Sequence, residues 1–337
     1  MFEFRVLSNE VVKQVLKMNQ VIDLVETVYK SKSECKTETW PTIFYDFEPG
    51  KADMDIKSGY LKSEKLFGHK TVTWFSENEE KGIPTLMGTI SVFNAETGKP
   101  LGVTDASFIT GIRTGASGAI GAKYLARKNS RHLLVIGIGN QAIFQIAATL
   151  TALPDLKRVR IWARNENKLK SFFGSISQRL LAEFGIDTKA IVFEEVEHLE
   201  DAVKNSDIII TATSSKVPLL KHEWVQRGTH ISCIGADMVG KQEIESEVMS
   251  KAIVFVDDKE HCIQVGEIEL PLKQGVITES NIAGEIGDVL LGKVKGRSSD
   301  EQITVFDSTG MALLDIYTAN IALKAAVEKD LGTKSEI

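Results

Sequence analysis

Apolar residues in the first part of the chain recur at the spacing of a helix and then change to the alternation of a strand. Within 10–31 they fall three and four positions apart, which predicts helix with a buried face. Within 70–105 apolar and polar residues alternate and β-branched residues are frequent, and the sequence at 95–100 is typical of a turn. Small residues then dominate 110–127, which favours a closely packed helix. The first third of the chain is therefore predicted to mix helix and strand.

From residue 132 onward, short apolar strands alternate with helical segments. Helices are predicted at 141–152 and 165–183. The predicted strands lie at 133–136, 159–162, 190–193, 208–211, 230–234 and 253–256. Strands that alternate with helices predict an α/β fold, in which a parallel sheet is covered on both faces. One more helix is predicted at 312–330, and we expect it to fold back onto the N-terminal half, which makes that domain discontinuous in sequence.

Composition narrows the possible partners. The chain has 337 residues, 43% of them hydrophobic and 26% charged, which suits two globular domains with separate cores. Lys+Arg 40 against Asp+Glu 46 gives a net charge of -6, and without a basic run this argues against nucleic acid or an anionic membrane. The apolar runs are too short to span a membrane, and the start lacks a signal-peptide pattern. The three cysteines form no Cys-x-x-Cys pair, so we expect reduced thiols in a cytoplasmic protein.

A glycine-rich turn joins the first strand and helix of the second region. The strand at 133–136 leads into Gly137-Ile138-Gly139-Asn140-Gln141-Ala142, a Gly-x-Gly-x-x-Ala sequence. The first glycine permits a tight turn, the second lets a pyrophosphate approach the backbone, and the alanine lets the helix pack closely on the strand. Such a turn alone is a weak signal. Because the next strand follows at 159–162, the context predicts a dinucleotide site with its phosphates at the helix N-terminus.

The residues after the second strand indicate which dinucleotide is bound. A carboxylate at this place would accept the ribose hydroxyls and repel a 2′-phosphate, but the chain has Ala163 followed by Arg164. The guanidinium of an arginine can pair with a 2′-phosphate. We therefore favour NADP(H) over NAD(H); the other interpretation is that Arg164 is an ordinary solvated loop residue.

Several short strings occur together along the chain. They are Gly68-His69-Lys70, Gly82-Ile83-Pro84-Thr85, Thr110-Gly111-Ile112-Arg113-Thr114-Gly115-Ala116, Lys123-Tyr124-Leu125-Ala126-Arg127, the 137–142 turn, Gly235-Ala236-Asp237-Met238-Val239-Gly240-Lys241-Gln242-Glu243, Gly266-Glu267-Ile268 and Phe306-Asp307-Ser308-Thr309-Gly310-Met311-Ala312. In this order they resemble the ornithine cyclodeaminase/mu-crystallin family over nearly the whole chain. The C-terminal half looks closest to the archaeal-type alanine dehydrogenases of that family.

The resemblance implies a homodimer with two domains in each subunit. A Rossmann domain with a doubly wound parallel sheet is expected over 128–305. A discontinuous α+β domain for substrate binding and dimerisation is expected from 1–127 plus 306–337. Members of the family oxidise or reduce amino and imino acids, or convert ornithine to proline through transient hydride transfer to NAD. A small amino or imino acid is therefore the expected substrate.

The resemblance also assigns roles to individual residues. Lys70 would hold the substrate or carry protons, with a pKa that burial can lower, and Asp237 would be the acid/base at the substrate nitrogen. Substrate would be bound by Lys70, Arg113 and Thr309, and to these we add Lys57, which is particular to this chain. The expected cofactor contacts are Thr85, Arg113, Gly137, Gly139, Asn140, Gln141, Ala163, Arg164, Thr213, Ile234, Gly235, Ala236, Lys241 and Ser308.

Each main assignment has a purely structural alternative. Lys70 could be an exposed strand lysine. Arg113, which we place near a helix start, could form a salt bridge across a domain boundary. Asp237 could cap its own loop as an Asx turn.

The chain departs from the family in the segments that bind the substrate carboxylate. Relatives carry a basic residue near position 42, where this chain has Thr42, and an arginine and methionine where it has Asp55 and Lys57. Lys57 could take over carboxylate binding, or Asp55 could meet an amine on a larger or basic substrate. The remaining interpretation is that both side chains face solvent.

Other chemistries find little support. The six histidines do not cluster, and beside His261 and Cys262 no further ligands stand at metal spacing, so we predict no metal. A Gly-x-Ser-x-Gly string is absent, which argues against a covalent hydrolase. The leading hypothesis is an NAD(P)-dependent oxidoreductase of amino or imino acids. The alternatives are ornithine cyclodeaminase, which regenerates its cofactor, and a non-catalytic NADPH-binding protein like mu-crystallin.

Overall fold

The computed structural model describes residues 3–336, and the chain divides into two compact units. One unit contains the chain up to Arg113 together with the chain from Met311 onward, and the other is Thr114–Gly310. The sequence analysis places the two divisions at 127/128 and 305/306, and these domain boundaries stay a prediction.

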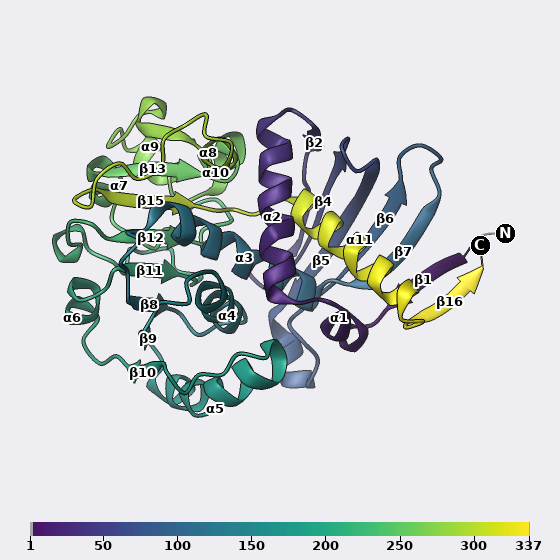
Figure 1. Cartoon of the computed structure of the whole chain (residues 1–337), viewed down its shortest axis with the longest axis horizontal. Helices are drawn as coiled ribbons and strands as arrows, with labels where there is room; N and C mark the ends of the chain where they lie inside the picture. The colour runs from purple at the N-terminus through teal and green to yellow at the C-terminus, as the bar shows by residue number, and fades with distance from the viewer. Residues whose placement is uncertain (1–2, 337) are drawn as a thin grey trace. The chain divides into compact units, whose positions relative to one another are not determined.

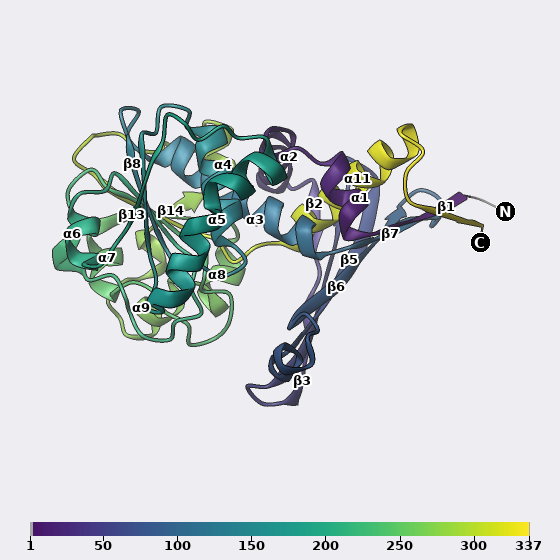
Figure 2. The ribbon, with the colours of Figure 1, turned by 90° about the horizontal axis from the view of Figure 1, so that it is seen from below.

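The discontinuous unit is built on a mixed sheet. Within the described residues its strand order is β16-β1-β7-β6-β5-β4-β2, with β3 paired to β4 as a branch. The pair β1–β7 is parallel and the other pairs are antiparallel. The strands are β1 (Glu3–Leu7), β2 (Thr37–Thr39), β3 (Ile43–Glu48), β4 (Ala52–Leu61), β5 (Leu66–Phe75), β6 (Leu86–Asn94), β7 (Pro100–Asp105) and β16 (Thr333–Glu336), with a 3-10 turn η1 (Ser76–Lys81) before β6. Figure 2 shows this sheet nearly edge-on.

The helical pattern at 10–31 is divided between two helices, α1 (Asn9–Val15) and α2 (Met18–Ser33). The helices are separate because Leu16 and Lys17 have extended backbone angles, which interrupt the hydrogen-bond ladder. The Ser8 hydroxyl accepts a hydrogen bond from the Val11 backbone at the start of α1, as an N-cap does.

The C-terminal helix α11 (Ala312–Glu328) lies across β4, β5, β6 and β7 (Figure 1), so it joins the N-terminal strands as predicted. Two glycines that face each other on β4 and β5 allow this close approach. A Cβ added at Gly59 would come within 2.8 Å of the Leu313 side chain, and one added at Gly68 would come within 3.4 Å of the Ile316 side chain. The same face of β5 carries Lys70, two positions beyond Gly68, because alternate residues of a strand share a face.

The second unit is a parallel sheet in the order β10-β9-β8-β11-β12-β15-β13-β14, and each of these pairs is parallel. The strands are β8 (His132–Ile136), β9 (Arg158–Trp162), β10 (Val192–Glu195), β11 (Ile208–Thr211), β12 (His230–Cys233), β13 (Ala252–Val256), β14 (Ile282–Glu285) and β15 (Ile303–Asp307). The order reverses between β8 and β11, which is the switch point where doubly wound sheets bind ligands. The predicted α/β fold with a Rossmann sheet is confirmed.

Helices and short turns connect these strands (Figure 1). They are α3 (Ser107–Leu125), which contains the first division of the chain, α4 (Ala142–Ala152), α5 (Glu166–Phe184), α6 (Leu199–Lys204), α7 (Ser246–Lys251), α8 (Lys259–Val265), α9 (Glu269–Lys273) and α10 (Ile286–Leu290), with the 3-10 turns η2 (His222–Trp224) and η3 (Glu279–Asn281). Central strands such as β11 are buried at each position, which explains why they read as continuous apolar runs. Among the described residues, each helix is too short or too polar to cross a membrane.

Candidate functional site

A buried charge cluster occupies the face of β5 that α11 covers. The Lys70 ammonium forms an ion pair with Asp315 of α11 at 2.9 Å between Nζ and Oδ2. The Arg113 guanidinium donates a hydrogen bond from Nε to Oδ1 of the same carboxylate, also at 2.9 Å. Lys70 and Arg113 are 4% and 7% exposed, and Asp315 is fully buried. Lys70 is therefore a buried, paired group and the alternative of an exposed strand lysine is wrong.

The cluster sets the protonation of its members. The pKa of Lys70 is lowered to about 8: desolvation is the main cause, the Asp315 carboxylate opposes the fall, and the positive charges of Arg113 and Lys57 contribute to it. Burial raises the pKa of Asp315, but the neighbouring Arg113 and Lys70 outweigh burial and leave it below its ordinary value. Lys70 and Arg113 thus share the Asp315 carboxylate, which leaves an excess of positive charge around Lys70.

Lys57 and Asp55 lie on the same side of the sheet as Lys70. Lys57 is the cross-strand partner of Lys70, and Asp55 is two positions earlier on β4, so the three side chains share a face. Both β4 residues are half-buried, and Asp55 Oδ1 is buried without a hydrogen-bond partner among the described residues. Both side chains are partly exposed, so all three interpretations of Lys57 and Asp55 stay open.

Arg113 lies in the interior of α3 rather than near its start, because the helix begins at Ser107. The placement near a helix start is therefore wrong. The salt bridge of Arg113 is made within its own unit, to Asp315. Thr85, another predicted contact, precedes β6 and is half-buried, and its carbonyl oxygen accepts a hydrogen bond from Phe75.

The glycine turn in the second unit has the geometry that a dinucleotide needs. Gly137 has a φ of 111°, and a Cβ there would come within 2.5 Å of the Ala212 carbonyl oxygen. At Gly139 an added Cβ would meet no atom within 4 Å, so its backbone is open to a ligand. Helix α4 begins after Gln141 without a side-chain cap, and a helix N-terminus of this kind favours phosphate oxygens. The turn, with Asn140 exposed beside it, fits the pyrophosphate of a nicotinamide dinucleotide.

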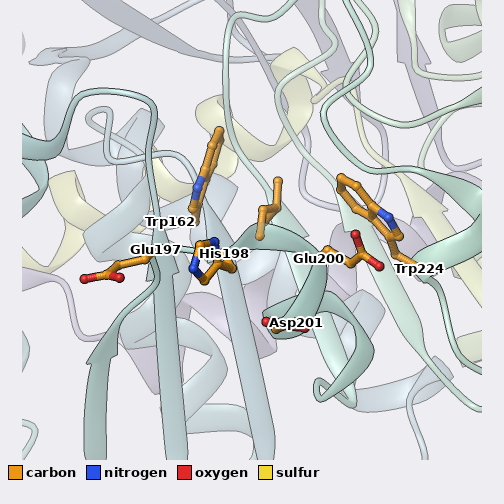
Figure 3. A pocket seen from close by; sticks show the side chains of 7 residues that line it. Trp162, Glu197, His198, Glu200, Asp201 and Trp224 are labelled. Carbon is orange, nitrogen blue, oxygen red and sulfur yellow. The ribbon is translucent and has the colours of Figure 1, made fainter.

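The predicted ribose position follows β9. Ala163 is half-buried and Arg164 is exposed, and within the described part of the chain no carboxylate pairs with this arginine. A surface hollow begins one residue earlier, at Trp162 (Figure 3). Its other lining residues are Glu197, His198, Leu199, Glu200, Asp201 and Trp224. Neither lysine nor arginine lines it, so its surroundings carry negative charge.

The loop after β12 carries Asp237 at the carboxyl end of the parallel sheet. Asp237 is exposed, and its carboxylate pairs with Lys241 at 2.5 Å from Nζ to Oδ1. The predicted acid/base therefore has a cationic neighbour four residues along. Of the other predicted contacts in this loop, Ile234 and Ala236 are buried and Gly235 is half-buried.

The loops after β11 and β12 are joined by a buried glutamate that sequence reasoning did not assign. Glu243 Oε1 accepts hydrogen bonds from the Thr213 backbone and hydroxyl at 2.6 and 2.7 Å. Its Oε2 accepts from the Thr211 hydroxyl at 2.7 Å and from the Gly235 backbone at 2.9 Å. Two predicted cofactor contacts, Thr213 and Gly235, are thus tied to one carboxylate.

A second buried carboxylate holds the segment after β15. Asp257 accepts hydrogen bonds from the Ser308 hydroxyl at 2.9 Å, from the Gly310 backbone at 2.8 Å and from the Thr309 backbone and hydroxyl at 3.3 Å. Both predicted contacts on this segment, Ser308 and Thr309, are buried. Asp257, like Glu243 and Asp315, gives no local signal in the sequence other than an acidic residue beside an apolar run.

One group of possible metal ligands occurs within the described residues: His222, Glu245 and Glu247. The His222 ring nitrogen Nδ1 is already 3.1 Å from Glu245 Oε2, and Glu247 is exposed. This group gives no independent reason to expect a metal.

Comparison with known proteins places the chain among coenzyme-dependent enzymes. The model of the ornithine cyclodeaminase/mu-crystallin family matches residues 3–330. Alanine dehydrogenase of Archaeoglobus fulgidus is 36% identical over 98% of both chains. The structure of an archaeal alanine dehydrogenase dimer with bound NAD superposes with a TM-score of 0.91, at 36% identity and over 100% of both chains. Thermococcus litoralis Delta(1)-pyrroline-2-carboxylate reductase, in complex with NADH and L-proline, gives a TM-score of 0.90 at 31% identity, over 98% of this chain and 99% of that one.

Proposed function

Because the chain belongs to the ornithine cyclodeaminase/mu-crystallin family, we propose that it is an NAD(P)-dependent oxidoreductase acting on the C–N bond of a small amino acid or a cyclic imino acid. The observation that carries the proposal is the buried Lys70–Asp315–Arg113 cluster with its excess positive charge. Such a cluster is suited to a small anion, and a substrate carboxylate would neutralise it. The relatives named above act on substrates of this class.

In this proposal, residues of this chain bind the substrate carboxylate and accept the proton from the substrate nitrogen. Lys70 and Arg113 hold the substrate carboxylate, with Lys57 and Thr309 as further contacts. In the oxidative direction the substrate loses a hydride from Cα and one proton from nitrogen, and C–N becomes C=N. Asp237, whose carboxylate pairs with Lys241, accepts that proton. A bound nicotinamide supplies or accepts the hydride; the residues that would hold it are the 137–142 turn and the loops carrying Thr213, Gly235 and Ser308.

For the coenzyme we propose NADP(H), on the basis of Arg164. This exposed guanidinium follows the strand at which the adenosine ribose of a Rossmann domain is recognised. The carboxylates of the neighbouring hollow, Glu197, Glu200 and Asp201, would repel a 2′-phosphate, so the preference depends on Arg164. Replacing Arg164 with alanine should raise the KM for NADPH by about tenfold or more, the loss of one charge-assisted pair, and leave the KM for NADH unchanged. A wild-type preference for NADH would contradict the proposal.

Ornithine cyclodeaminase activity is the second candidate, and Asp55 is the observation that favours it. A carboxylate with an unpartnered oxygen, on the same face as Lys70, could bind the side-chain ammonium of a diamino acid. Such a lyase would begin with the same oxidation of C–N to C=N, the side-chain amine would then displace ammonia from that carbon, and return of the hydride would restore the coenzyme, so ammonia is released without net NAD(P)H.

One assay separates these functions. The protein is incubated with NADP(H) or NAD(H) and ornithine, alanine, pyrroline-2-carboxylate, or pyruvate plus ammonia, while nicotinamide absorbance and free ammonia are followed. A net absorbance change supports the oxidoreductase, and ammonia without it supports the lyase. If neither changes, both enzymatic proposals fail and a coenzyme-binding protein without catalysis is left.

We further propose that the protein acts as a homodimer in the cytoplasm. Each position of β3 is exposed, including Ile43, Phe44, Tyr45 and Phe47, and exposed apolar groups of this size are typical of an interface. Replacing Phe44 and Phe47 with aspartate should shift the mass in analytical ultracentrifugation from two chains to one. An unchanged mass for the variant, or a monomeric wild type, would contradict this assignment.

A further inference from the structure

Glu243 and Glu267 form a pair of buried carboxylates that the proposed reaction does not use. Both are fully buried beneath the loops at the carboxyl end of the parallel sheet. They are linked directly, since Glu267 Oε1 accepts hydrogen bonds from the backbone N–H groups of Glu243 and Ile244, each at 2.8 Å. Although the two side chains lie close together, their carboxylates accept hydrogen bonds in different arrangements.

Glu243 receives a backbone N–H on each of its oxygens. Thr213 N–H donates to Oε1 and Gly235 N–H donates to Oε2. A backbone N–H cannot become an acceptor, so both atoms of the side-chain terminus must be oxygens without hydrogen. The Thr211 and Thr213 hydroxyls add one donor to each oxygen. Burial raises the pKa of Glu243, and these donors oppose the rise because they favour a carboxylate. Glutamine would set its NH₂ against one of the two N–H groups in either orientation.

Glu267 has the opposite arrangement. Both of its backbone donors reach Oε1, while Oε2 has no hydrogen-bond partner among the described residues. Burial and the neighbouring charge of Glu243 raise the pKa of Glu267 well above its ordinary value. This favours the neutral acid, with Oε2 as the oxygen that accepts no backbone donor, and glutamine imitates such a neutral side chain in shape and charge.

The Glu243 carboxylate connects the segments that the coenzyme requires. Thr213 and Gly235 follow β11 and β12, two paired parallel strands at the carboxyl end of the sheet. Gly235 is needed for the contact, since a Cβ there would lie 2.6 Å from Glu243 Oε2. The dinucleotide turn packs on the same segment, because a Cβ at Gly137 would meet the Ala212 carbonyl and the Thr213 side chain. Asp237 is only two residues beyond Gly235.

We propose that Glu243 is a positioning residue for the coenzyme: its two oxygens fix the loops after β11 and β12 in the conformation that receives the nicotinamide dinucleotide. The assignment of the coenzyme rests on the proposed function, whereas the tie between the loops rests on the hydrogen bonds alone. Glu267 holds the backbone of Glu243 and Ile244 through its Oε1, and this role does not require a charge.

The test compares Glu243→Gln with Glu267→Gln, two equally buried and chemically identical replacements. In the coenzyme-free protein, amide hydrogen exchange at Thr213 and Gly235 should become at least about tenfold faster in E243Q and stay at the wild-type rate in E267Q. NADPH fluorescence titration should show a Kd raised by about tenfold or more in E243Q only. In steady state, the KM for coenzyme should rise in E243Q without an equal rise in the KM for the amino acid.

Two results would overturn the proposal: unchanged exchange at Thr213 and Gly235 in E243Q, or equal effects of the two glutamine variants on exchange and coenzyme Kd. Thermal unfolding of both variants shows that they are folded, and Thr213→Val, which removes only the hydroxyl donor, provides a smaller graded effect. If the wild-type protein binds neither NADPH nor NADH, the proposed function fails, and the exchange measurement still decides whether Glu243 ties the two loops.

Discussion

The two units bury their carboxylates under opposite electrostatic conditions. In the discontinuous unit, Asp315 lies between Lys70 and Arg113, and these cations leave its pKa below the ordinary value. In the parallel-sheet unit, Asp307 is equally buried but meets neither lysine nor arginine among the described residues, and burial raises its pKa to about 8. Equal burial therefore gives an ionised aspartate in one unit and a protonated one in the other.

The difference shows how the function of each region depends on charge. Paired charges in the discontinuous unit stay ionised and leave a surplus cation for a substrate anion. In the parallel-sheet unit, buried acids serve the backbone: Asp307 Oδ2 accepts a hydrogen bond from Ile268, as Glu243 does from Thr213 and Gly235. Substitutions that remove the charge but keep the shape should distinguish a carboxylate that pairs with cations from one that only accepts backbone hydrogen bonds.

The largest effect is expected from comparing Asp315→Asn with Asp307→Asn. D315N leaves two buried cations without their carboxylate and should lower the free energy of unfolding by about 3–5 kcal/mol. D307N replaces a protonated acid with a neutral side chain of similar shape, and because the unfolded chain has already released the Asp307 proton at pH 7, the free energy of unfolding should stay unchanged or rise. Urea unfolding of the two variants measures both. Equal losses would contradict the comparison.

The pH dependence gives the same comparison a second test. Folded Asp307 keeps its proton up to a pKa of about 8, whereas the unfolded chain releases it near 3.8. Between these pH values the unfolded state binds fewer protons, so Asp307 makes stability fall as pH rises. D307N should remove this contribution and flatten the stability profile between about pH 4 and pH 8. A profile parallel to that of the wild type would show that Asp307 is ionised in the folded protein.

Sequence patterns predict most strands and helices of both units, but they do not predict the roles of buried carboxylates such as Asp315. The glycine turn at 137–142 and the alternating strands and helices are local features, and their physical requirements are visible within a few residues. Asp315 gains its role from Arg113, a partner 202 positions away. No spacing rule connects such residues, because only the folding of α11 onto the mixed sheet brings them together. The edge strands β2 and β3 were also missed, since β3 is exposed throughout and lacks the alternation of a half-buried strand.

The third prediction concerns the pH at which Lys70 loses its charge. A substrate carboxylate needs the protonated lysine, so kcat/KM should fall as pH rises through about 8. Lys57→Gln removes a neighbouring positive charge that lowers the pKa of Lys70, so the falling limb should move to higher pH. The KM should also rise about tenfold if Lys57 contacts the carboxylate.

Asp55→Asn is the matched control for Lys57→Gln. Asp55 lies two positions away on the same face of β4, but it is not among the groups that shift Lys70. D55N should therefore leave the pH at which kcat/KM falls unchanged. If Asp55 instead binds an amine, D55N raises the KM for ornithine while the KM for alanine stays constant. A limb that does not move in K57Q would show that Lys70 is not the group whose ionisation controls the reaction.

The smallest effect on stability is expected at an ion pair between a buried carboxylate and a solvent-exposed lysine. Glu269 has a buried side chain, and its Oε1 pairs with Lys273, whose side chain is 62% exposed. Its Oε2 accepts a hydrogen bond from the Gly240 backbone at 2.8 Å, in the loop that carries Asp237. Because water can replace the exposed ammonium, Lys273→Ala should cost less than about 1 kcal/mol in urea unfolding and leave the coenzyme Kd unchanged.

Glu269→Ala, which leaves the Gly240 N–H without its acceptor, should cost about 1–3 kcal/mol and weaken coenzyme binding. A loss in K273A as large as that in E269A would mean that Glu269 depends on its cation as Asp315 does, and the contrast between the two units would not extend to this loop.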